Sequence, residues 1–116
     1  MQSIEFKKMT LSNGLDVILH KDSAIPVVGV NVWYHVGSKD EEVGRTGFAH
    51  LFEHVMFEGS KHHNSSHFEP LQKAGANLNG STTPDRTNYR QDVPTNYLDL
   101  DLCIESDRMG ILQNAL

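Results

Sequence analysis

The residues in this sequence best suited to chemistry are two histidines and a glutamate within one short segment. His50, Glu53 and His54 form the pattern H-x-x-E-H. If the segment is helical, His50 and His54 lie one turn apart on the same face. Two neutral imidazoles with an open side suit Zn²⁺, and an adjacent carboxylate suits a base that acts on metal-bound water. The pattern therefore predicts a zinc site with Glu53 as general base.

The segment that carries these residues is expected to be a helix. It starts near Thr46, a residue type that favours the N-cap position, and lies between Gly47 and Gly59. Apolar residues nearly encircle it: Phe48, Leu51, Phe52, Val55, Met56 and Phe57. Such a helix is expected to be buried, and buried polar groups need partners, which favours a bound metal. The alternative is a pair of core histidines held by backbone carbonyls, with Glu53 paired to Arg45 or to a lysine.

Composition narrows the function classes. The chain has 116 residues, 38% of them hydrophobic and 22% charged, with a net charge of −5. Because nucleic-acid binding calls for a basic face, we expect no nucleic-acid partner. No apolar run approaches the ~18 residues of a membrane span, and the N-terminus lacks the apolar core of a signal peptide. We therefore expect no membrane span, and the compartment stays open.

Strand patterns dominate the first third of the chain. Residues 4–10 and 15–20 flank Asn13-Gly14, a dipeptide typical of a type I′ hairpin turn. Residues 27–36 alternate between apolar and polar side chains at period 2. These patterns predict a hairpin followed by a half-buried strand.

Histidines outside the H-x-x-E-H pattern are weaker candidates for metal ligands. His35 lies near the end of the third strand, where a half-buried structural histidine is commoner than a ligand. Residues 60–67 are rich in Ser, His, Asn and Lys and are expected to form an exposed loop. Its histidines are His62, His63 and His67. A second metal site there is the less favoured alternative.

A second short helix and a hairpin follow. The run from Ser66 to Glu69 fits a capping box, and Gly75 closes the helix. Residues 76–83 and 87–93 flank a turn and predict a hairpin. The first of these strands is poor in large apolar residues, which indicates an edge strand. Such an edge leaves room for an extended peptide to pair with it, and an ordinary polar edge is an equal alternative.

The last predicted element is a helix over residues 96–109, interrupted by Gly110. Its apolar face carries Leu98, Leu102 and Met109. Its charged residues, Asp99, Asp101, Asp107 and Arg108, are expected mostly outside. The single cysteine, Cys103, excludes an internal disulfide and is expected to be buried and inert. Strands precede and surround helices without a βαβ rhythm, so we expect one α+β domain with a mainly antiparallel sheet packed with helices.

Three ordered motifs together resemble the N-terminal part of the pitrilysin/insulinase family, the inverzincin zinc peptidases. They are residues 11–15, 45–59 and 77–89. The resemblance covers essentially the whole chain. The residues of this chain resemble those of the bacterial members most. It implies that residues 1–116 are a single incomplete domain, the N-terminal half of a pitrilysin/insulinase-like domain. The apolar chain end also indicates a fragment, and bacterial periplasm and cytoplasm are both open as compartments.

The resemblance also implies roles for particular residues. His50 and His54 would be zinc ligands, Glu53 the general base, and the strand with Asn79 and Gly80 would lie beside a peptide or protein substrate. The third ligand, a glutamate, and a second family-like domain or subunit would lie outside this chain. We therefore expect a zinc metalloendopeptidase whose isolated fragment is inactive or poorly active. The alternative is a non-catalytic family-like subunit, a peptide-binding or scaffold module.

Overall fold

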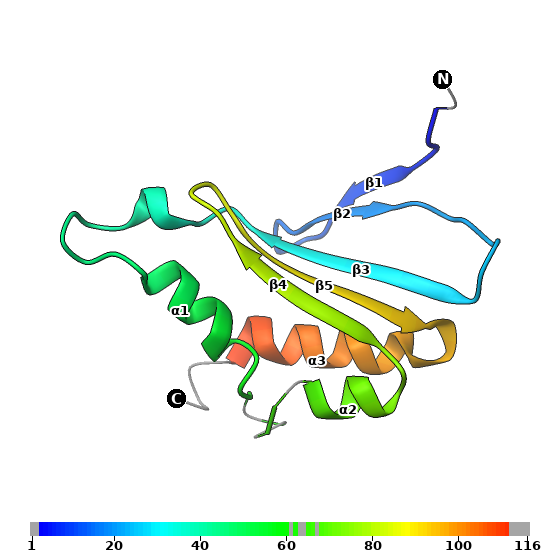
Figure 1. The fold of residues 1–116 in the computed structure, drawn as a ribbon. Coiled ribbons are helices and arrows are strands. Elements are labelled where there is room, and N and C mark those ends of the chain that lie inside the picture. Colours follow the sequence, from blue (N-terminus) through cyan, green and yellow to red (C-terminus); the bar gives the residue numbers. More distant parts are fainter. Residues whose placement is uncertain (1–2, 61, 63–64, 67, 112–116) are drawn as a thin grey trace.

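Along the chain, strands β1 to β3 come first, then helices α1 and α2, strands β4 and β5, and helix α3 (Figure 1). The computed structural model describes residues 3–60, 62, 65–66 and 68–111. The strands are β1 (Lys7–Thr10), β2 (Asp16–Leu19), β3 (Val27–Tyr34), β4 (Asn77–Thr82) and β5 (Thr87–Pro94). The helices are α1 (Phe48–Val55), α2 (Phe68–Lys73) and α3 (Leu98–Ile111), with short 3-10 turns η1 (Ser38–Asp40) and η2 (Thr95–Tyr97). The predicted α+β class with mainly antiparallel pairing is confirmed.

The main sheet has the strand order β3-β5-β4. The predicted hairpin is β4–β5, closed where the Thr83 N–H donates to the Arg86 carbonyl at 2.8 Å. Within the described residues β4 pairs only with β5, so it is an edge strand, as predicted. Helices α2 and α3 lie on one face of this sheet and α1 lies beside β4 (Figure 1). The edge strand and the histidine helix are therefore neighbours.

The core lies between this sheet and the two helices beneath it. Leu71 of α2, Val93 of β5 and Ile104 of α3 are buried together. Half-buried side chains surround them: Val28, Ala76, Leu78 and Leu100. Along β3 the predicted alternation is confirmed, because every second residue from Val28 to Tyr34 is partly buried and those between are exposed. The pattern arises because successive strand residues point to opposite faces.

The N-terminal hairpin forms with a different turn from the predicted one. Strands β1 and β2 pair in a separate two-stranded sheet. Gly14 has φ +89°, whereas Asn13 does not have a positive φ, so the type I′ expectation is wrong. Instead the Gly14 N–H donates to the Leu11 carbonyl at 2.9 Å, and the Asn13 side-chain oxygen accepts from the Leu15 N–H at 3.1 Å. A side-chain bond to the backbone two residues on favours this other turn.

Helix α2 closes as predicted. The Gly75 N–H donates to the Gln72 carbonyl and the Ala76 N–H to the Leu71 carbonyl, both at 2.9 Å, which is the Schellman pattern. At its other end the Glu69 N–H donates to the Ser66 carbonyl at 3.2 Å. His67, within the predicted capping box, lies outside the described residues, as does His63.

Helix α3 turns its charged face inward, which contradicts the sequence-based assignment of its faces. Asp101, Glu105 and Arg108 are buried, whereas Leu102 and Met109 are exposed. The buried residues are spaced i, i+4 and i+7, so they share one face toward β5. Arg108 pairs with Glu105 and lies 4.0 Å from the centre of the Tyr89 ring. Ion pairing and ring contact, which hydropathy does not report, therefore decide which face is buried.

Two smaller expectations about α3 are also wrong. The helix runs through Gly110 to Ile111, so the glycine does not interrupt it. Cys103 is exposed, because it lies on the outward side of the helix next to Leu102. The error about Cys103 follows from placing the face with Leu102 inside, whereas the error about Gly110 follows from treating a helical glycine as a break.

The buried charges make a prediction about stability. Burial raises the pKa of Asp101 to about 6, with the Glu105 carboxylate adding to the rise and Arg108 opposing it. Between about pH 4 and pH 6 the folded state holds this proton more tightly than the unfolded chain, so stability falls as pH rises through that window. Asp101→Asn is therefore expected to raise the free energy of unfolding at neutral pH by roughly 2–3 kcal/mol, and to change it little below about pH 4.

Urea unfolding of the protein at both pH values measures this effect. Asp99→Asn, an exposed change on the same helix, is the matched control and is expected to have little effect. Equal stabilisation by Asp101→Asn at both pH values would contradict the assignment of the effect to titration.

The accessible surface area of the chain is larger than that of a typical compact domain of the same mass. The accessible area is 8518 Å² for a mass of 13.0 kDa, against about 6,300 Å² for a typical compact monomer.

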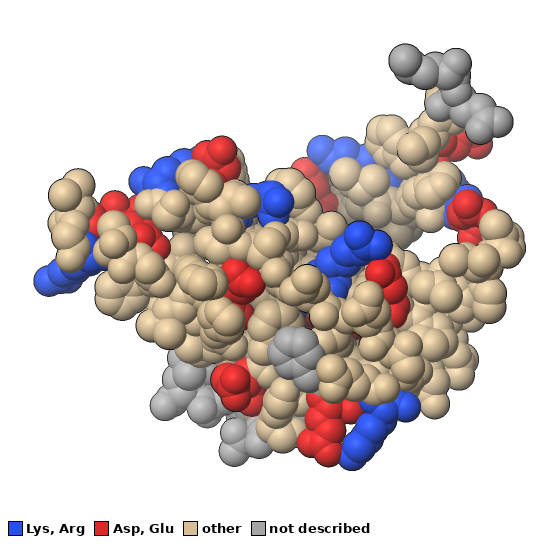
Figure 2. All heavy atoms as spheres, in the orientation of Figure 1, with Lys and Arg blue, Asp and Glu red and all other residues tan. Residues whose placement is uncertain are grey.

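On the face drawn in Figure 2, acidic and basic side chains are interspersed. Ion pairs such as Lys8–Asp16 at 3.1 Å join exposed groups and contribute little to stability. Among the described residues, no helix is both long and apolar enough to cross a membrane.

Candidate metal centre

Helix α1 begins one residue later than predicted. The N-cap is Gly47, with φ +98°, not Thr46. Gly47 has no side chain to accept the first amide hydrogens, and the Glu41 carboxylate accepts them instead. Its Oε2 accepts from the Gly47 N–H and its Oε1 from the Ala49 N–H, each at 2.8 Å. The cap therefore comes from a side chain several residues away.

The apolar surround of α1 is largely exposed, which contradicts the prediction of a buried helix. Phe48, Leu51 and Phe52 are 52, 55 and 50% exposed. Val55 and Met56 are half-buried, and among the described residues near the helix Glu53 and Phe57 are buried. Periodicity reports that these residues prefer burial, not which part of the protein covers them. The argument for a metal must therefore rest on geometry rather than on burial of the histidines.

The two histidines of the pattern point their ring nitrogens at each other. His50 Nε2 and His54 Nε2 are 3.1 Å apart, and both side chains are exposed. Two imidazoles on one tetrahedral zinc ion, each about 2.0–2.1 Å from it, place their nitrogens about 3.3–3.4 Å apart. The pair is thus close to the spacing that such an ion requires. The donor set of two imidazoles, with an open side for further ligands, fits zinc.

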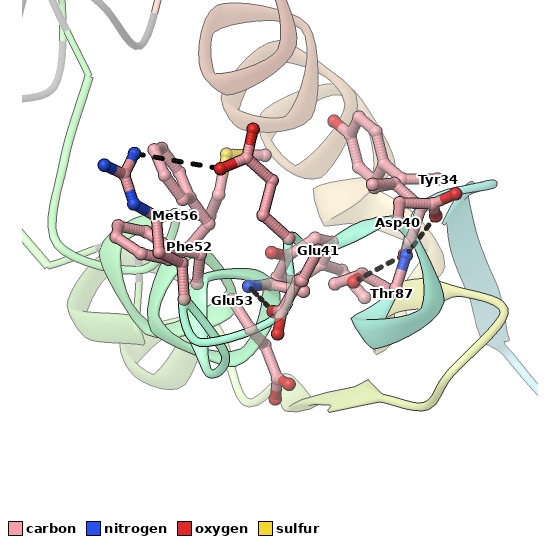
Figure 3. A pocket seen from close by; sticks show the side chains of 14 residues that line it. Tyr34, Asp40, Glu41, Phe52, Glu53, Met56 and Thr87 are labelled. Carbon is pink, nitrogen blue, oxygen red and sulfur yellow. Dashed lines mark hydrogen bonds and ion pairs between the residues drawn. The ribbon is translucent and has the colours of Figure 1, made fainter.

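Glu53 lies between the histidines and the edge strand. It is 8% exposed, and its Oε2 accepts a hydrogen bond from the Thr82 hydroxyl of β4. Figure 3 shows its side chain running from α1 away from the apolar pocket. Arg45, the partner weighed in the alternative interpretation, lies 3.9 Å from Glu42 instead. Glu53 is therefore held by β4 rather than by an ion pair with Arg45, and it lines one cavity with His50.

Gly80 makes room for this carboxylate. A Cβ atom at Gly80 would lie 3.0 Å from Glu53 Oε1 and 3.0 Å from the Phe57 ring, closer than side chains tolerate without moving. The Asn79 side-chain oxygen accepts from the Gly80 N–H at 2.9 Å. Asn79 is exposed and lines a different hollow from Glu53. The structure thus brings Gly80, but not the Asn79 side chain, to the Glu53 carboxylate.

A cavity of about 480 Å³ is lined by residues of both α1 and β4. Its lining includes His50 and Glu53 from α1 and Gly80 and Thr82 from β4. Glu41 also lines it. Sequence reasoning missed Thr82 and Glu41. For Glu41 a signal existed, since a glycine N-cap after an acidic run needs an outside acceptor, whereas no local pattern marks Thr82.

An apolar pocket of about 510 Å³ lies on the other side of α1 (Figure 3). It is lined by Tyr34, Phe48, Phe52, Met56 and Tyr89 among others. The exposed aromatic residues of α1 thus face a hollow rather than a packed core. Figure 3 shows Glu41 at this pocket beside the α1 backbone.

Two other described histidines, His35 and His62, do not line the cavity that contains His50 and Glu53. His35 is exposed, with its Nε2 3.4 Å from the Lys39 ammonium group. His62 Nδ1 lies 2.6 Å from Asp107 Oδ1, and the Ser60 hydroxyl donates to Oδ2 of the same carboxylate. The hydrogen bonds from Ser60 and His62 lower the pKa of Asp107. Within the part of the chain that the structure describes, no three His, Cys, Asp or Glu side chains cluster as a complete metal site.

Known proteins match this chain over most of its length. Residues 16–107 match the model of the family described as Insulinase (Peptidase family M16). The zinc protease PqqE of Helicobacter pylori is 34% identical over 108 residues, which cover 91% of this chain and 24% of that protein. The β subunit of the mitochondrial-processing peptidase of Blastocladiella emersonii is 35% identical over 80 residues, covering 68% of this chain and 17% of that subunit.

Solved structures show the same fold. A protease from Helicobacter pylori superposes with a TM-score of 0.89 at 32% identity, over 94% of this chain and 27% of that chain. Pitrilysin superposes with a TM-score of 0.86 at 26% identity, over 95% of this chain and 12% of that chain. The chain thus has the fold of a part of pitrilysin. It spans about a quarter or less of the length of each relative named here.

Proposed function

Because this chain belongs to the insulinase family, peptidase family M16, we propose that it is the N-terminal part of a zinc-dependent metalloendopeptidase. His50 and His54 are its two zinc ligands and Glu53 its general base. The observation that carries this assignment is the His50–His54 pair, with Nε2 atoms 3.1 Å apart. His50 of this pair lines one cavity with Glu53. The alternative, a non-catalytic peptide-binding or scaffold subunit, has no need to retain all three residues.

The chemistry divides between the metal and this chain's own carboxylate. A bound zinc ion supplies a Lewis acid that polarises the peptide carbonyl and makes water a better nucleophile. Glu53 takes the proton from the attacking water and later passes it to the leaving amine. Because Thr82 holds Oε2, we assign the proton transfer to Oε1.

The edge of β4 is the proposed binding surface for the substrate. An extended peptide adds to a sheet edge through main-chain hydrogen bonds. The β4 edge passes beside Glu53 at Gly80 and Thr82, so a paired peptide would lie next to the general base. Asn79 would contribute indirectly, because its side-chain oxygen accepts a hydrogen bond from the Gly80 N–H of this edge.

The rest of the machinery is proposed to lie in other parts of a longer protein. Two histidines leave a zinc site short of the three protein ligands that catalytic sites carry, so a third, a glutamate, is expected from elsewhere. The large exposed area and the uncovered aromatic side of α1 support residues 1–116 being one incomplete domain. A second family-like domain or subunit would close over the site.

Hydrolysis of an unstructured peptide tests this proposal. The longer protein that contains residues 1–116, called the full-length protein below, is expected to cleave this peptide. It should lose activity with a zinc chelator and regain it with added zinc. The 116-residue chain alone is expected to cleave it poorly or not at all. Peptide binding without any zinc-dependent cleavage by the full-length protein would instead support the non-catalytic module. Cleavage at full rate by the 116-residue chain would contradict the incomplete domain.

A further inference from the structure

The first turn of α1 depends on a side chain from outside the helix. Its N-cap, Gly47, offers no side-chain acceptor, so the first amides need partners from elsewhere. The two oxygens of Glu41 accept from the N–H groups of Gly47 and Ala49, and Ala49 immediately precedes His50. We propose that Glu41 is a positioning residue, which preforms the first turn of α1 and so holds His50 ready for metal binding.

Helix α1 needs such support more than most helices do. It has only eight residues, and helices of that length are unstable without tertiary contacts. Much of its outer side is exposed, at Phe48, Leu51 and Phe52. A carboxylate at a helix N-terminus stabilises it through charge-assisted hydrogen bonds and through the helix dipole. Glu41 supplies both effects at the turn that carries the first histidine.

Glu41 is itself fixed in place by the segment that precedes it. The Asp40 carboxylate accepts from the Gly37 N–H at 3.0 Å. The Ser38 N–H donates to the Thr83 carbonyl at 3.3 Å, which ties η1 to the β4–β5 turn. Gly37 packs so closely there that a Cβ atom would lie 2.2 Å from the Thr83 carbonyl oxygen. A chain of contacts therefore runs from the β4–β5 turn through η1 and Glu41 to α1.

This chain of contacts connects the two sides of the cavity. Glu41 is half-buried and lines the cavity that contains His50, Glu53 and Thr82. Glu53 is held by Thr82 on the strand side, and the first turn of α1 is held by Glu41. The spacing between histidine and edge strand thus depends on a residue outside the H-x-x-E-H pattern.

The variant Glu41→Gln tests the positioning role of Glu41, and this test rests on the proposed zinc site. The glutamine side chain keeps the shape but can accept from only one of the two amides, because its NH₂ group is a donor. If binding requires the ordered turn, loss of the cap reduces the binding-competent fraction. Zinc affinity of the full-length protein, measured by chelator competition, is expected to fall about tenfold, and exchange of the Gly47 and Ala49 amide hydrogens to accelerate.

Glu42→Gln is the matched control. It removes the same charge from the neighbouring position, where the carboxylate is exposed and lies 3.9 Å from Arg45. We expect zinc affinity and amide exchange to stay at the wild-type level. Wild-type protein that binds zinc at His50 and His54, with equal affinity in Glu41→Gln, would overturn the positioning role alone. Wild-type protein with no zinc at these histidines would overturn the proposed function, and the positioning role with it.

Discussion

Replacing Glu53 by glutamine is expected to reduce peptide hydrolysis by the full-length protein about a thousandfold while leaving zinc bound. The amide cannot accept the proton from water, and a positioned general base contributes roughly 10²–10⁴-fold. The amide oxygen can still accept the Thr82 hydrogen bond, so the local structure is expected to persist. The loss should appear in kcat, measured with saturating peptide, with metal content determined on the same sample.

Glu58→Gln serves as the control, since Glu58 is an exposed glutamate just beyond the end of α1. It is expected to retain wild-type kcat. Unchanged hydrolysis in Glu53→Gln would exclude Glu53 as the base. Loss of zinc together with hydrolysis would instead assign it a role in holding the metal.

The second large effect is expected at the histidines themselves. His50→Ala and His54→Ala should each weaken zinc binding more than about a hundredfold, because changes outside the coordination sphere already cost 10–100-fold. Chelator competition with the full-length protein measures this loss. The exposed His35 provides the comparison, and His35→Ala is expected to bind zinc like the wild type. A large loss in His35→Ala, with binding intact in the other two variants, would instead place the zinc site at His35, just after the end of β3.

Features set by local patterns were predictable from the sequence. The H-x-x-E-H helix follows from side chains spaced at i and i+4, and the alternation of β3 from the two-residue period of a strand. The β4 edge followed from its small polar residues. In each case neighbouring residues carry the signal, so one stretch of sequence suffices.

Features set by contacts between distant residues were not predictable. The inward charged face of α3 depends on Arg108 meeting the Tyr89 ring of β5, in addition to its pair with Glu105 on the same helix. The Thr82–Glu53 bond joins residues 29 positions apart. Hydropathy assigned the exposed aromatics of α1 to a core, whereas the described residues leave that side open. Such pairings need the fold itself, because no local spacing encodes them.

The most direct test of the account is the position of zinc in the full-length protein. Anomalous X-ray diffraction at the zinc edge should place one ion about 2.0–2.1 Å from both His50 Nε2 and His54 Nε2, with a third protein ligand from outside residues 1–116. The Glu53 carboxylate should lie beside the ion without coordinating it. An ion bound elsewhere, or none at these two histidines in zinc-saturated crystals, would contradict the proposed metal centre.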